Sequence, residues 1–405
     1  MKKVSFLIIL CFLTVNAFCC TSAIFTGKVT PDGRPLMWKN RDTDELNNRI
    51  EHFKGPRFDF LALVNSPVKG GEAWAGSNTA GFCIMNTASY NIHIIGDNST
   101  AGDGEGAVMY KALGLCKTVA DFERLLDTLK KPMAIEANFG VIDAEGGAAY
   151  FEVNNYKWIK RDVNDPAIAP NGYIVYTNFS YTGRIDEGHG YIRHDNADYA
   201  IQQGLKNGDV FTPQWIFNNL SRSYYNSLIG TDLYKSNATK ECNGWFLDQD
   251  FIPRESTSAA VVFQGVKSGD EADNTIMWCA MSYPPISLAI PMFLKYPDTL
   301  PDIMVKQTET PSNCKMCDMV LALKYKEVFP VKRGNGYKYF RFSKVFNADG
   351  TGYEQQLWPS ENQIFKESES VISLLRKGKL TKKELESFNT KISSIAVNAY
   401  ANLKN

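Results

Sequence analysis

The chain opens with an apolar run and then changes to short segments in which apolar and polar positions alternate. Residues 6–15 are mostly apolar. From residue 21 onwards, alternating runs bounded by Gly, Pro, Asn and Asp are typical of β-strands with one buried face. We expect strands in the segment that follows Cys20 and at residues 36–38, 58–64, 81–88, 138–144, 148–153, 157–161, 173–178, 257–266 and 275–281.

Apolar positions at helical spacing separate these strands into groups. They predict helices at residues 106–116, 119–130, 194–205 and 213–220. The resulting order is strands, two helices, strands, helices and strands, which differs from the strict alternation of a βαβ protein. We therefore expect an α+β architecture in which antiparallel sheets carry helices on their outer sides.

The pattern changes after about residue 300. A short helix is expected at 313–324 and a strand at 338–344, and two amphipathic helices follow at the end of the chain. The last helix begins with a capping box, Thr381 to Glu384, and carries an apolar stripe, Leu385, Phe388, Ile392, Ile395 and Ala399. We expect a main domain at residues 20–300 and a C-terminal extension at residues 301–405 that packs on it.

The apolar run at the start has the form of a signal peptide, residues 1–19. A charged beginning precedes an apolar stretch that is too short to span a bilayer, and small residues stand at Ala17 and Cys19. Cleavage after Cys19 would make Cys20 the first residue of an exported protein, periplasmic or secreted. Its thiol would then lie beside a free α-amine with an ordinary pKa of roughly 7.7–8.0, a built-in general base.

Two other readings of this junction remain open. A cysteine after an apolar run could carry a lipid, although Phe18 before Cys19 does not suit a bacterial lipoprotein site. Cys20 could also be a buried apolar residue or half of a disulfide. Seven of the nine cysteines would remain after cleavage, an odd number that leaves at least one free thiol.

Charge and hydropathy exclude some classes of function. The 44 basic and 44 acidic residues balance, which argues against nucleic acid as a partner. Beyond the first residues, the chain has no apolar run long enough for a membrane span. The sequence therefore predicts a protein without stable membrane insertion that acts on a small molecule, and it leaves a homo-oligomer open.

A predicted hairpin brings a carboxylate to Cys20. The strand after Cys20 ends in a turn at 30–34, and the second strand runs into Asp42. If the turn centres near Pro31, paired positions add to about 63, so Asp42 lies nearly opposite Cys20. Opposed residues in an antiparallel pair lie roughly 4.5–5.5 Å apart.

Two asparagines close apolar strands and are candidates for donors to a developing oxyanion. Asn86 ends the strand that begins at 81, and Asn178 ends the strand at 173–178. Asparagine is disfavoured inside strands, and its amide can stabilise an oxyanion. Either residue taken alone could simply begin a turn.

These features together resemble a known enzyme group. They are Cys20-Thr21-Ser22, the hairpin closing in Lys39-Asn40-Arg41-Asp42, a Gly-x-Asn-x-x-Gly-Phe run leading to Met85-Asn86, and Thr177-Asn178. Over roughly residues 20–290 they resemble N-terminal nucleophile hydrolases, more closely the linear amide C–N hydrolases: choloylglycine hydrolases, penicillin V acylases and isopenicillin N acyltransferase-like proteins. The resemblance implies a four-layer αββα sandwich, a thiol freed by processing, and neither a metal nor an organic cofactor.

The resemblance also implies roles for individual residues. Cys20 would be the nucleophile and its α-amine the base, while Asp42 would contact the amine. Asn86 would contribute to the oxyanion hole, and Asn178 would bind the acyl carbonyl or orient the amine.

The family carries two arginines whose equivalents here are less direct. Lys39 stands where the family has an arginine near the thiol, and Arg41 would face the same way two residues on. Arg254 is the nearest candidate for a second arginine near the strand at 257–266. We place Lys39 and Arg41 in the substrate site, and expect its apolar acyl pocket to be lined by Trp74, Phe82, Tyr90 and Phe139.

Other motifs predict no further chemistry. Cys314 and Cys317 form a C-x-x-C pair without a second ligand pair, so we expect no metal site there. The Gly-rich segment 102–106 lacks a preceding strand and a following Lys-Ser or Lys-Thr, and we expect a lid or turn.

The sequence thus predicts an exported cysteine amidohydrolase that cleaves a linear N-acyl amide through a thioester on Cys20. Conjugated bile salts, acylated amino acids, fatty-acid ethanolamides and penicillin-type side chains are all open as substrates. Two alternatives remain: an acyltransferase of the isopenicillin N type, and a non-catalytic surface lipoprotein or binding module.

Overall fold

The structure is a computed structural model that describes residues 19–97, 99, 104–236, 244–308 and 312–404. Most of the predicted signal peptide, residues 1–18, lies outside the described residues, as do part of the Gly-rich segment and Cys242. Cys19 is the first described residue and is still joined to Cys20. The signal peptide and its cleavage therefore stay predictions.

In the first sheet, the first two strands of the chain lie in interior positions and not at an edge. Its order is β10-β1-β2-β14-β15-β16, and every neighbouring pair is antiparallel. The strands are β1 (Thr21–Phe25), β2 (Leu36–Asp42), β10 (Tyr173–Tyr176), β14 (Thr257–Gln264), β15 (Ile276–Met281) and β16 (Ala289–Phe293). Segments more than 200 residues apart in sequence are thus adjacent around β1 and β2.

The second sheet is an antiparallel meander that runs in chain order from β3 to β9. Its strands are β3 (Asn48–Phe53), β4 (Phe60–Asn65), β5 (Ala75–Asn78), β6 (Cys83–Ala88), β7 (Ala137–Ile142), β8 (Ala148–Val153) and β9 (Trp158–Asp162). The chain passes from the first sheet to the second directly after β2. The end of β2 therefore lies where the two sheets meet.

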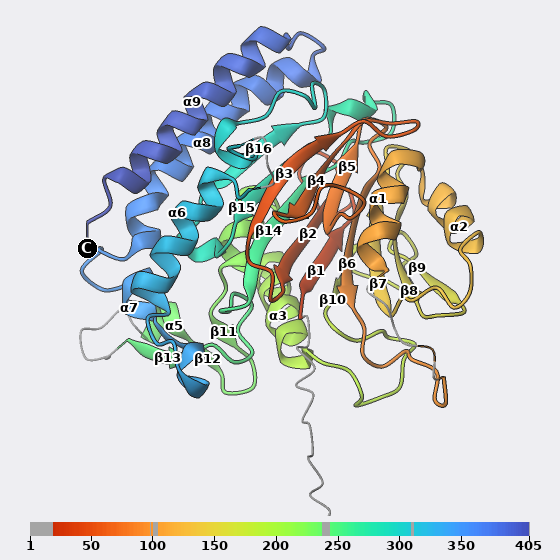
Figure 1. Cartoon of the computed structure of the whole chain (residues 1–405), viewed down its shortest axis with the longest axis horizontal. Coiled ribbons are helices and arrows are strands. Elements are labelled where there is room, and N and C mark those ends of the chain that lie inside the picture. Colours follow the sequence, from red (N-terminus) through yellow and green to blue (C-terminus); the bar gives the residue numbers. More distant parts are fainter. Residues whose placement is uncertain (1–18, 98, 100–103, 237–243, 309–311, 405) are drawn as a thin grey trace, which may run out of the picture.

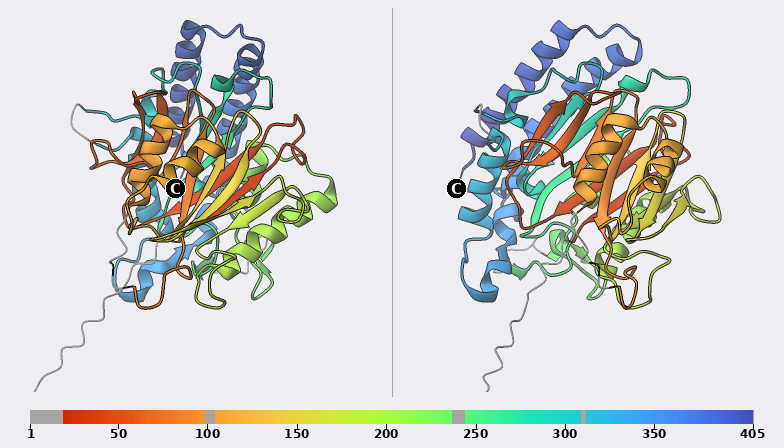
Figure 2. Two further views of the ribbon diagram at one scale, coloured as in Figure 1. Left: turned by 90° about the vertical axis from the view of Figure 1, so that its right-hand side faces the viewer. Right: turned by 45° about the vertical axis from the view of Figure 1, so that its right-hand side comes forward.

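Helices cover the outer sides of the two sheets, as Figures 1 and 2 show. On the second sheet lie α1 (Glu105–Leu115) and α2 (Val119–Asp127). On the first sheet lie α3 (Tyr191–Asn207) and α4 (Pro213–Ile216), which continues as the π-helical turn η1 (Phe217–Ser221). The result is a four-layer αββα arrangement, which confirms the predicted α+β fold class.

The C-terminal extension adds helices to the same side as α3 and α4. It contains α6 (Lys315–Leu323) with the π-helical turn η5 (Lys324–Val328), α7 (Phe342–Val345), α8 (Tyr353–Arg376) and α9 (Lys382–Ala401). Long α8 and α9 run side by side along one edge of the molecule in Figure 1. The capping box of α9 is present, since Thr381 accepts from Glu384 and the Glu384 carboxylate accepts from Thr381.

Short elements complete the chain. They are β11 (Tyr225–Asn226) paired with β12 (Thr231–Asp232), α5 (Leu233–Ser236), β13 (Trp245–Leu247) paired with β17 (Tyr339–Arg341), and the 3₁₀ turns η2 (Ala272–Asn274), η3 (Pro284–Ile286), η4 (Asp302–Met304) and η6 (Gly334–Lys338).

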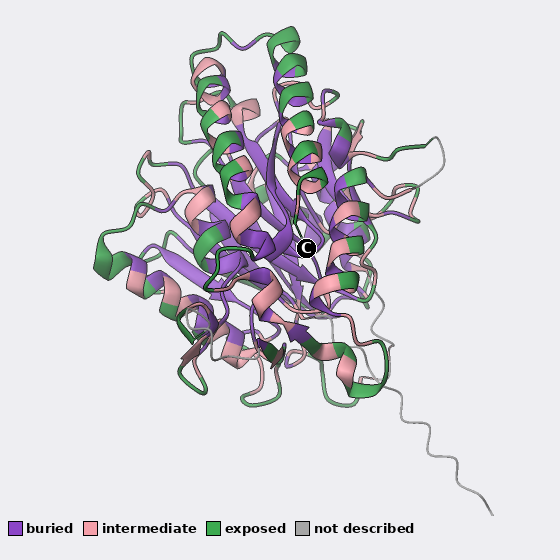
Figure 3. Ribbon diagram, turned by 90° about the vertical axis from the view of Figure 1, so that its left-hand side faces the viewer, coloured by how far each residue is buried: buried purple, intermediate pink, exposed green. Residues whose placement is uncertain are grey.

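The buried residues form two clusters, one on either side of the second sheet. The larger cluster fills the space between the sheets and beneath the helices of the first sheet. The smaller one lies between the second sheet and α1 and α2. In Figure 3 the strands are buried almost throughout, while the helices expose their outer faces. This burial on both sides explains why the strands are more apolar than simple alternation requires.

The structure differs from the sequence-based expectation at several elements. Strands β3, β5 and β16 were not expected: β3 contains charged residues, β5 is only four residues long, and β16 carries Pro291. The strand expected at 338–344 is the three-residue β17 followed by α7. Polar residues at an edge and very short strands weaken the pattern that sequence reading depends on.

No helix in the described part of the chain is long and apolar enough to cross a membrane.

Candidate active site

Cys20 lies directly before β1, next to the end of β2. Thr21 is paired with Asn40, so the register continues Cys20 toward Arg41 rather than Asp42. Paired positions add to 61 rather than about 63, because the turn between the strands is centred one residue earlier than we placed it, and Asp42 lies one residue beyond the position opposite Cys20. Asp42 is still adjacent: the Cys20 Sγ lies 4.0 Å from its carbonyl oxygen. The Cys20 residue is only 5% exposed.

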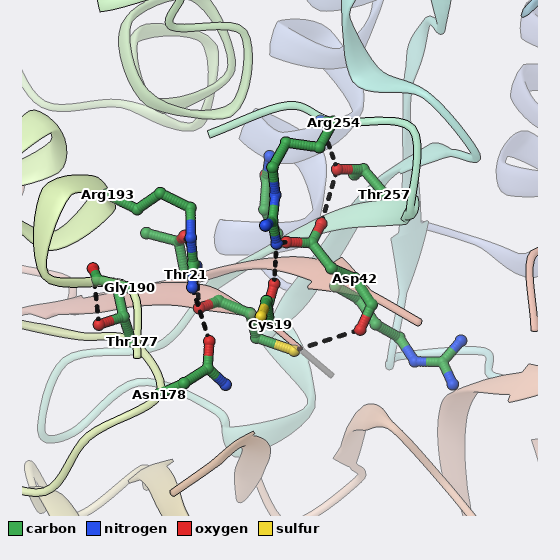
Figure 4. A network of polar contacts seen from close by, with 12 residues as sticks. Cys19, Thr21, Asp42, Thr177, Asn178, Gly190, Arg193, Arg254 and Thr257 are labelled. Carbon is green, nitrogen blue, oxygen red and sulfur yellow. Dashed lines mark hydrogen bonds and ion pairs between the residues drawn. The ribbon is translucent and has the colours of Figure 1, made fainter. Parts of the chain in front are cut away.

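The Asp42 carboxylate is held by Thr257, the first residue of β14, and by Arg254 in the turn that precedes this strand. Thr257 pairs with Asp42 across the sheet and donates from Oγ1 to Oδ1 at 2.6 Å. Arg254 forms an ion pair with Oδ2. Figure 4 shows Arg254 and Thr257 at the two different oxygens of this carboxylate. Burial is the largest single effect and lowers the pKa of Arg254, but the charge and hydrogen bond of Asp42, together with Cys19 and Asp248, raise that pKa overall.

Arg254 also reaches the residue that precedes Cys20. Its Nη2 donates to the carbonyl oxygen of Cys19 at 2.8 Å. One guanidinium thus connects the Asp42 carboxylate with the peptide group that contains the nitrogen of Cys20. The structure therefore brings Cys20, Asp42 and Arg254 together, as the sequence predicted.

Lys39 and Asn86 meet at the same end of the sandwich. Lys39 on β2 donates from Nζ to Oδ1 of Asn86 at 2.8 Å and to the carbonyl oxygen of Trp74 at 2.9 Å. The Lys39 side chain is fully buried, and this burial lowers its pKa to about 8. Asn86 is 6% exposed. An ammonium only donates, so it contacts the oxygen of the amide and not its nitrogen.

Arg41 faces the same way as Lys39 but reaches different groups. Its Nη1 donates to Asn48 at 2.8 Å and its Nη2 donates to Asn65 at 2.9 Å, both on the second sheet. Its guanidinium also lies over the Trp74 ring, 4.8 Å from the centroid. Of the two cations, Lys39 is therefore the one that contacts Asn86.

Asn178 is joined to Cys20 through an arginine that the sequence analysis missed. Arg193 donates from Nη2 to Asn178 Oδ1 at 2.7 Å, and from Nη1 to the Cys20 carbonyl at 2.6 Å and Thr21 Oγ1 at 2.8 Å. The amide nitrogen of Asn178 donates to the Ala88 carbonyl at 2.9 Å. Figure 4 shows the Arg193 guanidinium between Asn178 and Thr21.

Arg193 is 1% exposed, and its acceptors in the described residues are neutral. Burial and the nearby Arg254 lower the pKa of Arg193. The sequence offered one signal. Arg193 lies in the first turn of α3, three residues after Gly190, among the buried residues of that helix. Because the predicted helix began at 194, this arginine was left outside it.

Of the four aromatic residues predicted to line an acyl pocket, two lie at the site. Trp74 supplies the carbonyl for Lys39, and the Tyr90 main-chain nitrogen donates to the Asn178 carbonyl at 3.3 Å. Burial raises the pKa of Tyr90, and the nearby Cys19 and Cys20 thiols contribute.

Phe82 and Phe139 do not lie where we predicted them, in the acyl pocket. Both are completely buried in the smaller core cluster, where their rings pack against Phe122 of α2. Phe139 stands opposite Asn86 in the register of β6 and β7, yet its ring contacts α2. These two rings belong to the outer core, because residues of the second sheet have helices to pack against on that side.

A further carboxylate near the site was also missed. Glu105 begins α1, is 7% exposed, and contributes electrostatically to both Lys39 and Tyr90. It follows the Gly-rich segment, which the sequence analysis interpreted as a lid or turn. A carboxylate in the first turn of a helix interacts favourably with the helix dipole.

The other motifs stay outside the site. Cys314 caps the N-terminus of α6, where its sulfur accepts from the Cys317 nitrogen at 3.4 Å. In the described ranges, no group of three or more His, Cys, Asp or Glu residues could hold a metal ion. No histidine among the described residues hydrogen-bonds Cys20.

A cavity of about 550 Å³ lies between the first sheet and the helices α4 and α8. Its walls include Trp278 and Phe365, whose rings stack 4.6 Å apart, and Arg376 of α8. None of the residues around Cys20 lines it, so it is separate from the candidate site.

Comparisons with known proteins give structural neighbours only. No protein-family model matches the chain, and no curated protein matches it. The structure is similar to the Caenorhabditis elegans orthologue of N-acylethanolamine-hydrolysing acid amidase, with 14% identity and a TM-score of 0.41 over 60% of this chain and 92% of that one.

Two bacterial structures are also similar. A mutant of the conjugated bile acid hydrolase from Clostridium perfringens has 11% identity and a TM-score of 0.43, over 68% of this chain and 92% of that one. Penicillin V acylase from Agrobacterium tumefaciens has 15% identity and a TM-score of 0.37, over 71% and 89%. These proteins are N-terminal nucleophile hydrolases of the choloylglycine hydrolase and penicillin acylase group, the group that the sequence motifs resemble.

Proposed function

We propose that this protein is an exported cysteine amidohydrolase that cleaves a linear N-acyl amide through an acyl-enzyme on Cys20. One observation carries the proposal: Asp42, adjacent to Cys20, is paired with Arg254, which also donates to the Cys19 carbonyl. Removal of residues 1–19 would leave the new α-amine of Cys20 beside this carboxylate and guanidinium. The amine would be held next to the thiol that it has to deprotonate.

The neighbouring charges favour the basic form of that amine. Arg254 and Arg193 both lie close to the main chain at Cys20, and like charges oppose protonation of an amine. Asp42 opposes this effect and orients the amine. A base whose pKa lies near the working pH is the most effective one for general base catalysis.

In the acylation step, the α-amine takes the proton of the Cys20 thiol as the sulfur attacks the amide carbonyl. The C=O π electrons move to oxygen, and Asn86 Nδ2 donates a hydrogen bond to that oxyanion. The intermediate collapses with cleavage of the C–N bond. The protonated α-amine returns the proton to the leaving amine, and a thioester remains on Cys20.

In the deacylation step, water attacks the thioester. The α-amine takes one proton from the water, and the oxyanion forms again beside Asn86. Collapse breaks the C–S bond, and the sulfur recovers the proton from the α-amine. The products are a carboxylic acid and the free amine, and the enzyme regains its starting state.

The first experiment tests the nucleophile. Wild type and Cys20→Ala are assayed with a panel of N-acyl amides: conjugated bile salts, N-acyl amino acids, N-acylethanolamines and penicillin V. We expect hydrolysis of at least one class by wild type and a loss of about 10⁴-fold or more in Cys20→Ala. Cys83→Ala, which removes a buried thiol in the second sheet, is the control and should retain kcat. Equal turnover by wild type and Cys20→Ala would overturn the proposal.

The second experiment tests the processing step. Intact-mass measurement of the exported protein is expected to show a chain that starts at Cys20 with an unmodified amine. A chain that keeps Cys19, or that carries a lipid on either cysteine, would favour the lipoprotein alternative. Product analysis with an added amine acceptor separates hydrolysis from acyl transfer, and we expect free acid as the main product.

A further inference from the structure

We propose that Lys39 is a positioning residue that holds the Asn86 side chain in the one orientation able to stabilise the oxyanion. This inference rests on the proposed function and extends it to a residue that differs from the family pattern. The residue acts through Asn86 rather than on the substrate, and it works only while its amine is protonated.

The first argument is the geometry of the amide. Asn86 has one acceptor oxygen and one donor nitrogen that exchange places when the amide rotates by half a turn. The Lys39 ammonium lies 2.8 Å from the oxygen and has no lone pair to accept from the nitrogen. The contact therefore fixes the oxygen toward Lys39 and turns the nitrogen away. Within the described part of the chain, that nitrogen has no hydrogen-bond acceptor.

The second argument is that both ends of this contact are rigid. The Lys39 Nζ is also bound to the Trp74 carbonyl at 2.9 Å, so it cannot follow a rotating amide. The main chain of Asn86 is held in the ladder of β6 and β7. The Asn86 side chain could still rotate, and the hydrogen bond from Lys39 prevents that rotation.

The third argument concerns the proton on Lys39. A neutral amine has a lone pair and could accept a hydrogen bond from the Asn86 nitrogen. The amide could then rotate and aim its oxygen at the reacting carbonyl oxygen, which repels the developing negative charge. Loss of the proton thus removes the orientation even though both side chains stay in place.

The surroundings decide when that proton is lost. Burial lowers the Lys39 pKa to about 8, and the positive charge of Arg41 acts in the same direction. Three acidic groups oppose this: Cys20 before β1, Asp42 on β2 and Glu105 on α1. Protonated Lys39 is the active form, so activity falls as pH rises through about 8. The α-amine of Cys20 must be deprotonated, which shapes the acidic side of the profile instead.

Arg41 does not duplicate this role. Its Nη1 donates to Asn48 and Ser258, and its Nη2 donates to Asn65, so both terminal nitrogens have other acceptors. A substitution at Lys39 therefore removes the cation that, among the described residues, is seen bound to Asn86.

The test compares Lys39→Met, Lys39→Arg, Asn86→Ala and the double variant Lys39→Met/Asn86→Ala. Lys39→Met should lower kcat by about 100-fold with little change in KM, because one oxyanion donor is worth about 10²–10³. The double variant should be no slower than Asn86→Ala alone. Lys39→Arg, which cannot lose its charge, should keep kcat within about tenfold and lose the decline in activity above pH 8.

A second readout is independent of activity. The ¹⁵N side-chain resonance of Asn86, identified by its absence in Asn86→Ala, should shift with pH around 8 in wild type and not in Lys39→Arg. An unchanged kcat in Lys39→Met, additive effects in the double variant, or a shift that persists in Lys39→Arg would each overturn the role of Lys39. Absence of amidase activity in wild type would instead overturn the proposed function.

Discussion

At the scale of single residues, the candidate site is organised around a buried carboxylate with specific partners. Asp42 is 2% exposed and takes contacts from Arg254 and Thr257. Arg254 also receives support from Thr257, whose Oγ1 accepts from the Arg254 main-chain nitrogen at 2.9 Å. Thr257 therefore connects the positions of the carboxylate and the guanidinium.

Thr257→Val should lower kcat/KM by about 10- to 100-fold. The substitution keeps the shape and removes a hydrogen bond to a charged group, which is worth about 1.5–3 kcal/mol. Thr26→Val is the matched control: Thr26 is equally buried and donates to the Gly172 carbonyl at 3.0 Å, at the other end of β1. Steady-state kinetics check this, and equal losses in both variants would contradict a specific role for Thr257.

Sequence reading at this scale found the residues that stand near Cys20 in a hairpin or close a strand. It named Asp42, Asn86, Asn178 and Arg254, and the structure brings all four to one end of the sandwich. It missed Arg193, because 173 residues separate it from Cys20 and its side chain looks like an ordinary helix arginine. The residues next to an arginine in the sequence do not predict which distant carbonyl its side chain will contact.

At the scale of elements, the C-terminal extension supports the turn that holds Asp42. Lys324, in the π-helical turn after α6, is fully buried and donates to the carbonyls of Glu255 and Thr257, the latter at 3.3 Å. The adjacent Tyr325 donates to the Glu255 carboxylate at 2.7 Å. A π-helical turn shifts the side chains of a helix, and here it directs Lys324 and Tyr325 to the same segment.

Burial of Lys324 predicts a change of stability with pH. Its pKa is lowered to about 8, whereas an unfolded chain keeps the ordinary value of 10.5. Between these values the unfolded chain binds more protons, so the stability of the folded state rises with pH. Relative to Lys324→Met, wild type should therefore gain about 2 kcal/mol between pH 7.5 and 9.5.

Denaturant unfolding of both proteins at the two pH values measures this gain. Lys326→Met, which changes an exposed lysine of the same turn, is the control and should show no such difference. A stability difference between wild type and Lys324→Met that stays constant with pH would show that Lys324 is not held in a charge-disfavouring environment.

Strand and helix patterns predicted these elements unevenly. The helices α1, α2 and α9 were expected because apolar residues recur in them at helical spacing. The strands β7 and β8 were expected as short apolar runs, and every residue of both is buried. The π-helical turns η1 and η5 were not expected, since their geometry depends on what the helix packs against. For this reason the sequence pattern did not predict that Lys324 contacts the segment that holds Asp42.

At the scale of the whole molecule, the extension and the main domain share a buried ion pair. Arg222, after η1, forms two short contacts with Glu361 of α8, at 2.7 and 2.6 Å, and both side chains are almost completely buried. Glu361 also accepts from the Ala289 nitrogen of β16 at 2.8 Å. This contact links α8 to the outer side of the first sheet, and among the described residues none of the hydrogen bonds of Arg222 or Glu361 involves Cys20 or Asp42.

Glu361→Gln should destabilise the protein by about 3–5 kcal/mol, because it leaves Arg222 buried without its charge partner. The kcat measured at a temperature where the variant is folded should stay near that of wild type. The control is Glu367→Gln on the same helix, which breaks the exposed contact with Lys391 and should cost at most about 1 kcal/mol. Denaturant unfolding and steady-state kinetics give both quantities, and a small loss of stability in Glu361→Gln would contradict this role.

The sequence by itself determined the layered α+β fold, the hairpin that brings Asp42 to Cys20 and the strand-end asparagines, because these depend on local periodicity and on turns. Only the tertiary structure decided the partners: which of Lys39 and Arg41 contacts Asn86, that Phe82 and Phe139 pack under α2, and that Arg193, Thr257 and Lys324 support the site. Such contacts join residues that are 17 to more than 200 positions apart. Their energy comes from burial and charge in the folded chain, which no short stretch of sequence contains.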